Sequence, residues 1–343
     1  MSATQQAIRA ASLSVVVPIY NEETGIDALI ERLVPACEGQ FDSRFEILLI
    51  NDGSTDSSWQ KICDHADRDS RIAGIDLSRN HGHQLALSAG LSQTIGDYVF
   101  VLDADLQDPP ELLGTMLQEL RSGADVAYGQ RQCRRGETAF KRGTAALFYR
   151  LLGKLVETDI PRDTGDFRLM TRRVADHLLA MPERYRFVRG MVSWIGFQQV
   201  AVAYERDARF AGETHYPLRK MLALAADAVT SFSTVPLRFA SHLGMLFGLV
   251  GLASLSWVGW GWLTGGTVRG WASLATLVLL LGSAQLLVLG VFGEYLGRMY
   301  METKRRPLFM IAEVHRQPAV TALSANPVHR MNQEITESLR AAG

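Results

Sequence analysis

Two carboxylates stand one residue apart at Asp103 and Asp105, directly after the apolar run 98–102. Alternation along an extended chain directs both side chains the same way. Such carboxylates repel each other unless a cation lies beside them, and a hard divalent ion such as Mg²⁺ or Mn²⁺ takes oxygen ligands of this kind together with phosphate oxygens. Asp-x-Asp pairs are also common in loops and helix caps, so the pair alone favours an ordinary turn over a metal site.

Further polar segments follow three other apolar runs in the first half of the chain. These segments are 18–23, 51–56 and 78–83. The apolar runs alternate with stretches of helical periodicity, such as 24–37 and 83–94. This alternation predicts an α/β domain with a mainly parallel, doubly wound sheet. Ligands of such sheets bind beyond the carboxyl ends of the strands, where we expect the polar segments to meet.

A cluster of cationic residues follows the short apolar run 125–128. Its members are Arg131, Arg134, Arg135, Lys141 and Arg142, with Glu137 as the opposing charge. A solvated surface is one interpretation, and an anion site is the other, because arginine presents a fork that suits phosphate oxygens. His81 and His83 are expected to be loop or helix-cap residues, since no further metal ligand lies near them in the sequence. No P-loop or dinucleotide-binding glycine string occurs.

Charge and composition restrict the class of protein. The formal net charge is -1 with 21% charged and 47% hydrophobic residues, which fits a globular chain and gives no global argument for a nucleic-acid partner. The cysteines, Cys37, Cys63 and Cys133, are widely spaced and odd in number, which argues against a disulfide framework and fits a reducing compartment. The apolar run 13–17 is too short for a signal peptide.

Two uncharged runs, 243–263 and 270–293, predict transmembrane helices joined by a short loop. The first run would extend roughly 31 Å as a helix, which matches a hydrocarbon core of about 30 Å. Cationic residues flank the pair at Arg238, Arg298 and 304–306, whereas the loop holds Arg269 alone. This distribution predicts that both termini face the cytoplasm, as in a multi-pass protein of the cytoplasmic (inner) membrane. Four tryptophans gather at the loop end as an aromatic belt would, at Trp257, Trp260, Trp262 and Trp271.

The predicted organisation has four parts. A cytoplasmic α/β domain covers 1–215, a helix covers 216–240, the two spans lie within 241–295, and a cytoplasmic tail follows from 296 to 343. The helix in 216–240 has apolar positions at a 3.6-residue period. It packs in the core of the first domain in one interpretation and lies on the bilayer surface in the other, which its position before the spans favours.

The motif Asp103-Ala-Asp-Leu-Gln-Asp-Pro-Pro-Glu111, together with the segments 17–23 and 51–56, resembles the inverting family 2 glycosyltransferases with a GT-A fold. Further segments resemble their polyprenyl-phosphate branch, similar to dolichol-phosphate mannose synthases and bactoprenol glucosyltransferases. These segments are 165–170, 189–191, 194–197, 231–233, 236–238 and 293–298. The resemblance runs from about residue 13 to residue 307, nearly the whole chain.

The resemblance implies a role for each matching residue. The residues that match base and ribose contacts are Pro18, Tyr20, Asn21, Glu22 and Asp52. Asp103 matches a carboxylate near ribose and metal, while Asp105 and Gln107 match the ligands of Mg²⁺ or Mn²⁺. The residues that match an acceptor-phosphate site are Arg131, with Lys141 or Arg142 as further contributors. Those that match donor-phosphate contacts are Arg209 and His215, where histidine replaces the usual lysine. Segment 51–56 also suits a turn and helix cap, and both roles can coexist.

Asp166 matches a carboxylate near the donor sugar, which is either a general base or a group that binds sugar hydroxyls. The acceptor implied by the resemblance is a phosphate monoester whose second pKa is about 6, so it is already largely ionised at pH 7. We therefore expect positioning and charge stabilisation to matter more than proton removal.

The sequence thus predicts a metal-dependent hexosyltransferase. The donor would be a nucleotide-diphosphate sugar such as UDP-glucose, and the acceptor undecaprenyl phosphate or another polyprenyl phosphate at the cytoplasmic membrane face. One alternative is a processive polysaccharide synthase, although the Gln-x-x-Arg-Trp string and the further spans that it needs are absent. The other is an inactive sugar-nucleotide-binding scaffold. Two protein partners are compatible with this prediction: a second copy of the chain in a homo-oligomer, and a lipid-sugar flippase of the same pathway.

Overall fold

The computed structural model describes residues 11–131, 164–205, 235–264 and 270–317. The chain divides into two compact units, which are described separately. The first unit contains Met1–Tyr149, Thr158–His215 and Pro307–Gly343, and the second contains Arg150–Glu157 and Tyr216–Arg306. The first unit therefore includes a segment that follows the second unit in the sequence.

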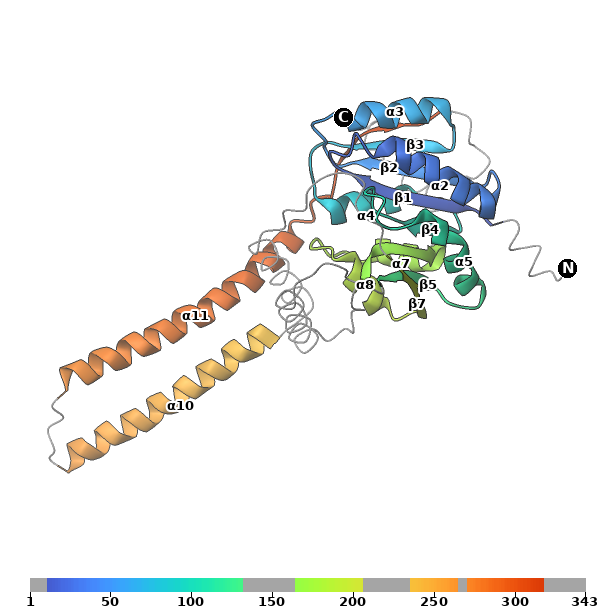
Figure 1. Cartoon of the computed structure of the whole chain (residues 1–343). Helices are drawn as coiled ribbons and strands as arrows, with labels where there is room; N and C mark the ends of the chain where they lie inside the picture. Colours follow the sequence, from blue (N-terminus) through green and yellow to red (C-terminus); the bar gives the residue numbers. More distant parts are fainter. Residues whose placement is uncertain (1–10, 132–163, 206–234, 265–269, 318–343) are drawn as a thin grey trace. The chain divides into compact units, whose positions relative to one another are not determined.

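An eight-stranded sheet forms the centre of the first unit, in the order β7-β5-β6-β4-β1-β2-β3-β8 (Figure 1). Its strands are β1 (Leu13–Ile19), β2 (Phe45–Asn51), β3 (Ile72–Leu77), β4 (Tyr98–Val101), β5 (Val126–Arg131), β6 (Thr164–Thr171), β7 (Gln199–Tyr204) and β8 (Ile311–His315). The neighbours β4, β1, β2 and β3 run parallel, and β7 is parallel to β5. Strands β6 and β8 are antiparallel to their neighbours. The predicted mainly parallel α/β sheet is confirmed.

Helices cover both faces of this sheet (Figure 1), and its central strands are mainly apolar. Every residue of β1 and β2 is buried, as expected when both faces are covered. The helices of this unit are α2 (Ile26–Phe41), α3 (Ser58–Arg68), α4 (His83–Gln93), α5 (Leu113–Arg121), α7 (Arg172–Ala180) and α8 (Val188–Ile195). Val15 and Val17 pack with residues of α2 and α5 in one cluster, whereas Val16 faces α4 on the opposite side.

A glycine brings α4 close to the sheet. A Cβ atom at Gly90 would lie 2.4 Å from Val16 Cγ1 and 2.6 Å from Ile50 Cδ1. A larger residue at this position would therefore push the helix outward. The first turn of the same helix carries His83 and Gln84.

Strand β8 returns the chain to the edge of the sheet after the second unit. It pairs antiparallel with β3, with Val314 opposite Ile75. The residues after it are tied to the domain as well, since Arg316 Nη2 donates to the buried carboxylate of Glu46 at 2.5 Å. The predicted tail from residue 296 thus contains a strand that the sequence pattern did not indicate.

The second unit contains two long helices, α10 (Val235–Leu263) and α11 (Trp271–Thr303), which lie side by side and run in opposite directions. Both predicted apolar runs are helical. Within the described residues, the segment Leu280–Thr303 is long and apolar enough to cross a membrane, and none of it is buried. Helix α10 begins ahead of the predicted start at residue 243, and residues 216–234 of the predicted surface helix lie outside the described residues.

Candidate active site

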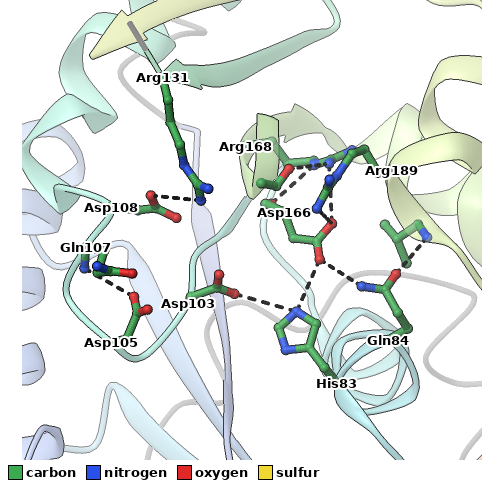
Figure 2. Close-up of polar contacts among 12 residues, drawn as sticks. His83, Gln84, Asp103, Asp105, Gln107, Asp108, Arg131, Asp166, Arg168 and Arg189 are labelled. Atoms are coloured by element: carbon green, nitrogen blue, oxygen red, sulfur yellow. Dashed lines mark hydrogen bonds and ion pairs between the residues drawn. The ribbon is translucent and has the colours of Figure 1, made fainter. Parts of the chain in front are cut away.

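The loop after β4 holds the carboxylates that first suggested chemistry. Asp103, Asp105 and Gln107 all lie in this loop at the carboxyl end of the strand (Figure 2). Leu106 adopts a left-handed backbone with φ of 57°, and the backbone N–H of Gln107 donates to Asp105 Oδ1 at 3.2 Å. The loop therefore turns sharply within the predicted metal-binding motif, so that its three polar side chains lie in one short turn.

Antiparallel pairing between β4 and β6 brings Asp166 opposite this loop. Val101 is the register partner of Arg168, and continuing the same register beyond the end of β4 places Asp103 opposite Asp166. His83, from the first turn of α4, lies between the two carboxylates. Its Nε2 atom is 3.2 Å from Asp166 Oδ2 and 3.5 Å from Asp103 Oδ1. Three separate elements thus meet at one point.

Asp166 is buried among positively charged and hydrogen-bonding groups. Gln84 Nε2 donates to its Oδ2 atom at 2.8 Å, while Nη2 atoms of Arg168 and Arg189 lie 3.6 and 3.9 Å from its Oδ1 atom. Burial acts to raise the pKa of Asp166, but the hydrogen bond from His83 and the charges of Arg189 and Arg168 outweigh it and hold the pKa well below its usual range. The carboxylate is therefore ionised and has little affinity for a proton at neutral pH.

Asp103 has the opposite electrostatic environment. Burial raises its pKa to about 6, partly offset by His83 and reinforced by the carboxylates of Asp166, Asp108 and Asp105. Its Oδ1 atom is buried and accepts no hydrogen bond from the described residues. An additional cation beside this atom would relieve the repulsion among the carboxylates.

The donor set at the β4 loop fits a divalent ion only in part. Asp103, Asp105 and Gln107 offer oxygen ligands of the type that Mg²⁺ and Mn²⁺ prefer. Among the described residues, however, no group of three or more histidine, cysteine, aspartate or glutamate side chains is arranged to hold a metal by itself. A bound ion would need ligands from elsewhere, such as phosphate oxygens.

A second polar cluster lies at the carboxyl end of β5. Arg131 Nε donates to the hydroxyl of Tyr204 at 3.2 Å, and Arg131 Nη2 lies 3.7 Å from Asp108 Oδ1. The Tyr204 hydroxyl in turn donates to Asp108 Oδ1. Sequence reasoning assigned Arg131 to a phosphate site but gave no role to Tyr204 or Asp108. The motif containing Asp108 offered a signal for that residue, whereas Tyr204 had none.

The two loops predicted to bind a nucleoside contact each other directly. Asn21, with φ of 54°, accepts the backbone N–H of Thr55 at its side-chain Oδ1 (2.8 Å). The backbone N–H of Asn21 donates to Ser54 Oγ at 3.0 Å, and that of Glu22 donates to Ser58 Oγ, at the start of α3, also at 3.0 Å. The ring of Tyr20 is half exposed beside them. These bonds hold the β1 and β2 loops together, so the residues predicted to contact base and ribose lie side by side.

Asp52 fixes the loop after β3. Its carboxylate accepts the backbone N–H groups of His81 at 2.7 Å and Gly82 at 2.9 Å. Gly53 has φ of +66°, and a Cβ atom there would lie 2.5 Å from the backbone nitrogen of Asn80. The expected turn is therefore present, and a nucleotide contact by Asp52 stays a prediction that would be additional to these bonds.

Other predicted residues lie near this edge or outside the described residues. Pro18 lies in β1, opposite Ile50 of β2. The remaining predicted phosphate contacts are outside the described part of the chain: Lys141, Arg142, Arg209 and His215. The structure thus brings Asp103, Asp166 and His83 together. It does not test the phosphate contacts predicted for these four residues.

Known proteins show the family of this chain. Residues 14–179 match Glycosyl transferase family 2. The chain is 48% identical to the uncharacterized glycosyltransferase YkcC of Bacillus subtilis (strain 168), over 87% of this chain and 92% of the relative. It is 38% identical to the prophage bactoprenol glucosyl transferase homolog of Escherichia coli (strain K12), over 88% of this chain and 99% of the relative.

The bactoprenol glucosyl transferase of Shigella phage SfX is also 38% identical, over 87% of this chain and 98% of the relative. Among solved structures, glucosyl-3-phosphoglycerate synthase from Mycobacterium tuberculosis, in complex with Mn²⁺, UDP and glucosyl-3-phosphoglycerate, is 18% identical with a TM-score of 0.43. The similarity covers 66% of this chain and 80% of that one. The chain belongs to glycosyltransferase family 2, has a GT-A fold, and is similar over most of its length to the bactoprenol glucosyl transferases.

Proposed function

We propose that this glycosyltransferase moves a sugar, with inversion, from a nucleotide-diphosphate donor to a polyprenyl phosphate at the cytoplasmic face of the membrane. The names of the bactoprenol relatives favour glucose as the transferred sugar, and we propose UDP-glucose as its donor. The observation that carries the proposal is the convergence of the Asp103 loop, Asp166 and Arg131 at one edge of the sheet. A carboxylate loop for a metal and an arginine for a phosphate are the parts that such a transfer needs.

The donor nucleoside is proposed to lie on the β1 and β2 loops. Hydrogen bonds between these loops, such as that from Thr55 to Asn21, make the surface rigid before a ligand arrives. The residues proposed to contact base and ribose are Pro18, Tyr20, Asn21, Glu22 and Asp52. Arg209 and His215 are proposed to contact the donor phosphates.

A divalent ion, Mg²⁺ or Mn²⁺, is proposed at the β4 loop. Asp105 and Gln107 would hold it, with Asp103 turned partly toward the nucleotide. The buried Asp103 Oδ1 atom without a hydrogen-bond donor among the described residues supports an added positive charge here. When bound, such an ion neutralises the diphosphate as it leaves. The incomplete protein donor set is consistent with diphosphate oxygens as the remaining ligands.

Asp166 is proposed to position the donor sugar rather than to remove a proton. Its low pKa makes it a weak base at neutral pH. A phosphate monoester is mostly ionised there, so one of its oxygens can attack the anomeric carbon while the bond from that carbon to the nucleoside diphosphate breaks. The Asp166 Oδ1 atom is buried and accepts no hydrogen bond from the described residues, which makes it a suitable acceptor for a sugar hydroxyl.

The acceptor phosphate is proposed to bind Arg131, with Lys141 or Arg142 as further contacts. The guanidinium lies near the β4 loop and bears a fork that matches phosphate oxygens. It would offset the repulsion between the arriving phosphate and the donor diphosphate. Placing two anions together in this way is the main electrostatic demand of the reaction.

Helices α10 and α11 are proposed to span the membrane as a hairpin. Strand β8 supports this topology, because it pairs with β3 of the catalytic unit after the chain has passed through both helices. A chain that leaves and rejoins the same domain must cross a bilayer an even number of times. We propose that the catalytic unit and both termini lie on the cytoplasmic side, in line with the cationic residues that flank the pair.

A transfer assay tests the proposal. The purified full chain is incubated with polyprenyl phosphate and a panel of UDP- and GDP-sugars, with and without Mn²⁺. Lipid carrying a single sugar is expected, detected by mass spectrometry. No lipid-linked product from any donor would refute the proposal and favour the scaffold alternative, and a polymer would favour a processive synthase.

A further inference from the structure

Pairing between β5 and β7 places Arg131 beside Tyr204. The two strands are parallel, and Arg131 is the register partner of Tyr204. Strand β7 lies at the edge of the sheet, and Tyr204 is its last residue. The ring therefore reaches the carboxyl end of β5, where Arg131 ends that strand and the proposed acceptor site begins.

The ring of Tyr204 is held in one position by its neighbours. It is 5% exposed and contacts Phe167 edge to face, with ring centroids 5.6 Å apart. A Cβ atom at Gly129 would lie 2.8 Å from Tyr204 Cε1 and 2.4 Å from Phe167 Cδ1, so only glycine leaves room for both rings. Because the ring cannot move freely, the direction of its hydroxyl is set by the core of the sheet.

The hydrogen bonds around that hydroxyl run in one direction. Tyr204 has one hydroxyl proton, which it donates to Asp108 Oδ1, so its oxygen is left to accept Nε–H of Arg131. Asp108 is fully buried, and its charge attracts Arg131 Nη2 at 3.7 Å (Figure 2). A buried carboxylate thus holds a tyrosine, and the tyrosine holds an arginine.

These contacts engage one side of the guanidinium. Among the described residues, Tyr204 and Asp108 contact Nε and Nη2, and none accepts a hydrogen bond from Nη1. Gly165 adds to the fit, because a Cβ atom there would lie 2.9 Å from Arg131 Nη2. The side chain of Arg131 is 24% exposed, so the remaining donors can reach a ligand.

We infer that Tyr204 and Asp108 are positioning residues that hold the guanidinium of Arg131 toward the phosphate of the acceptor. The inference rests on the proposed function, in which Arg131 binds that phosphate. An arginine on a strand end loses much side-chain entropy when it binds a ligand, and a fixed orientation removes that cost beforehand. Tyr204 therefore affects recognition of the acceptor and not recognition of the nucleotide sugar.

Replacing Tyr204 with phenylalanine tests this role in the full chain. Y204F keeps the ring and its packing and removes only the hydroxyl. We expect the KM for polyprenyl phosphate to rise about tenfold, because a hydrogen bond to a charged group is lost. The KM for the nucleotide sugar should change less than about twofold. D108N, which keeps the shape of the side chain, should shift the two constants in the same pattern.

Y98F is the matched control, since Tyr98 packs against Phe41 at the amino end of β4, whereas the proposed site lies beyond the carboxyl end of this strand. It loses the same atom and should leave both constants unchanged. Y204F is also combined with R131Q. A residue that acts only through Arg131 should add less than about a twofold change in this background. If turnover of R131Q is too slow, binding of a short-chain polyprenyl phosphate gives the same comparison.

The outcomes separate the inference from the proposed function. No lipid-linked product from the wild-type chain would refute the proposed function and remove the basis of the inference. An active wild type with an unchanged acceptor KM in Y204F would overturn the inference alone. A tenfold effect of Y204F that persists in the R131Q background would also overturn it, because Tyr204 would then act by another route.

Discussion

Gln84 links three elements through one side-chain amide, and Q84L measures how strongly they are held. Its Nε2 atom donates to Asp166 Oδ2 at 2.8 Å, and its Oε1 atom accepts the backbone N–H of Val188 at 2.8 Å. Val188 begins α8, so this N–H has no partner within its own helix. Leucine has a similar size but provides neither bond. Both polar groups would then be buried without this partner.

The expected loss follows from the two bonds. A hydrogen bond to a charged group contributes about 1.5–3 kcal/mol and a neutral one about 1 kcal/mol. Because His83, Arg168 and Arg189 still stabilise Asp166, we take the lower part of the sum, about 2.5–3 kcal/mol of unfolding free energy.

Urea unfolding of the full chain in a mild detergent, followed by intrinsic fluorescence, measures this loss. Gln93 lies at the end of the same helix, and the hydrogen bond of its side chain to another described residue is to the adjacent Ser92. Q93L should therefore cost less than about 0.5 kcal/mol. If Q84L lowers the unfolding free energy by less than about 1 kcal/mol, or by no more than Q93L does, the Gln84 amide does not hold α4, β6 and α8 together.

Three further predictions concern separate features of the chain. D105N should reduce transfer by at least about a hundredfold in the Mn²⁺ assay while the unfolding midpoint stays unchanged, since it removes a proposed metal ligand. Hydrogen bonds from Arg71 hold the pKa of Asp69 below its usual value; the stabilisation is present above the unfolded pKa of about 3.9 and is lost as pH falls through the folded pKa. Wild type should therefore lose more stability than D69N when unfolding is measured at pH 5 and then at pH 3. G129A should cost about 1–3 kcal/mol in the same unfolding assay and raise the acceptor KM, because its Cβ would lie 2.4 Å from Phe167 Cδ1.

The parallel half of the sheet could be predicted because each of its strands has a recognisable local sequence pattern. Each of β1 to β4 is an apolar run followed by a polar loop, and hydrophobic burial on both faces makes such runs visible in the sequence. The polar loops then lie at one edge by topology alone. The grouping of Asp103, Asp105 and Gln107 with the loops at Asn21 and Asp52 could thus be anticipated.

Non-local pairing explains what could not be predicted. Strand β8 has five residues, and its pairing with β3 depends on residues more than two hundred positions earlier. Likewise, β6 lies between β4 and β5 in the sheet, although it follows both in sequence. The opposition of Asp103 and Asp166 is a consequence of that insertion, and no local pattern encodes it.

The roles of single residues also could not be predicted from the sequence, because these roles depend on contacts with residues of other strands. His83 was interpreted as a loop or cap residue, and in the structure it does lie at the start of α4, but its ring contacts Asp166 and Asp103 from other strands. No sequence motif surrounds Tyr204, and the role that we infer for it depends on the strand register that places it beside Arg131. A functional contact between distant residues becomes visible only when the fold is known.

The opposite pKa shifts of Asp103 and Asp166 indicate where an added positive charge is most favourable. Asp166 is buried and Asp103 is partly buried, and desolvation acts to raise both pKa values. Asp166 has His83, Arg168 and Arg189 around it, and these cations lower its pKa despite burial. Asp103 has His83 Nε2 at 3.5 Å and interacts electrostatically with Arg131 and Arg168, yet its pKa rises to about 6. A metal ion beside Asp166 would be repelled by the cations that already neutralise this carboxylate. Beside Asp103 and Asp105 it would relieve a carboxylate repulsion that the protein compensates only in part. The electrostatics therefore support the proposals that Asp166 positions the donor sugar and that a metal ion, with the donor diphosphate, binds at the β4 loop.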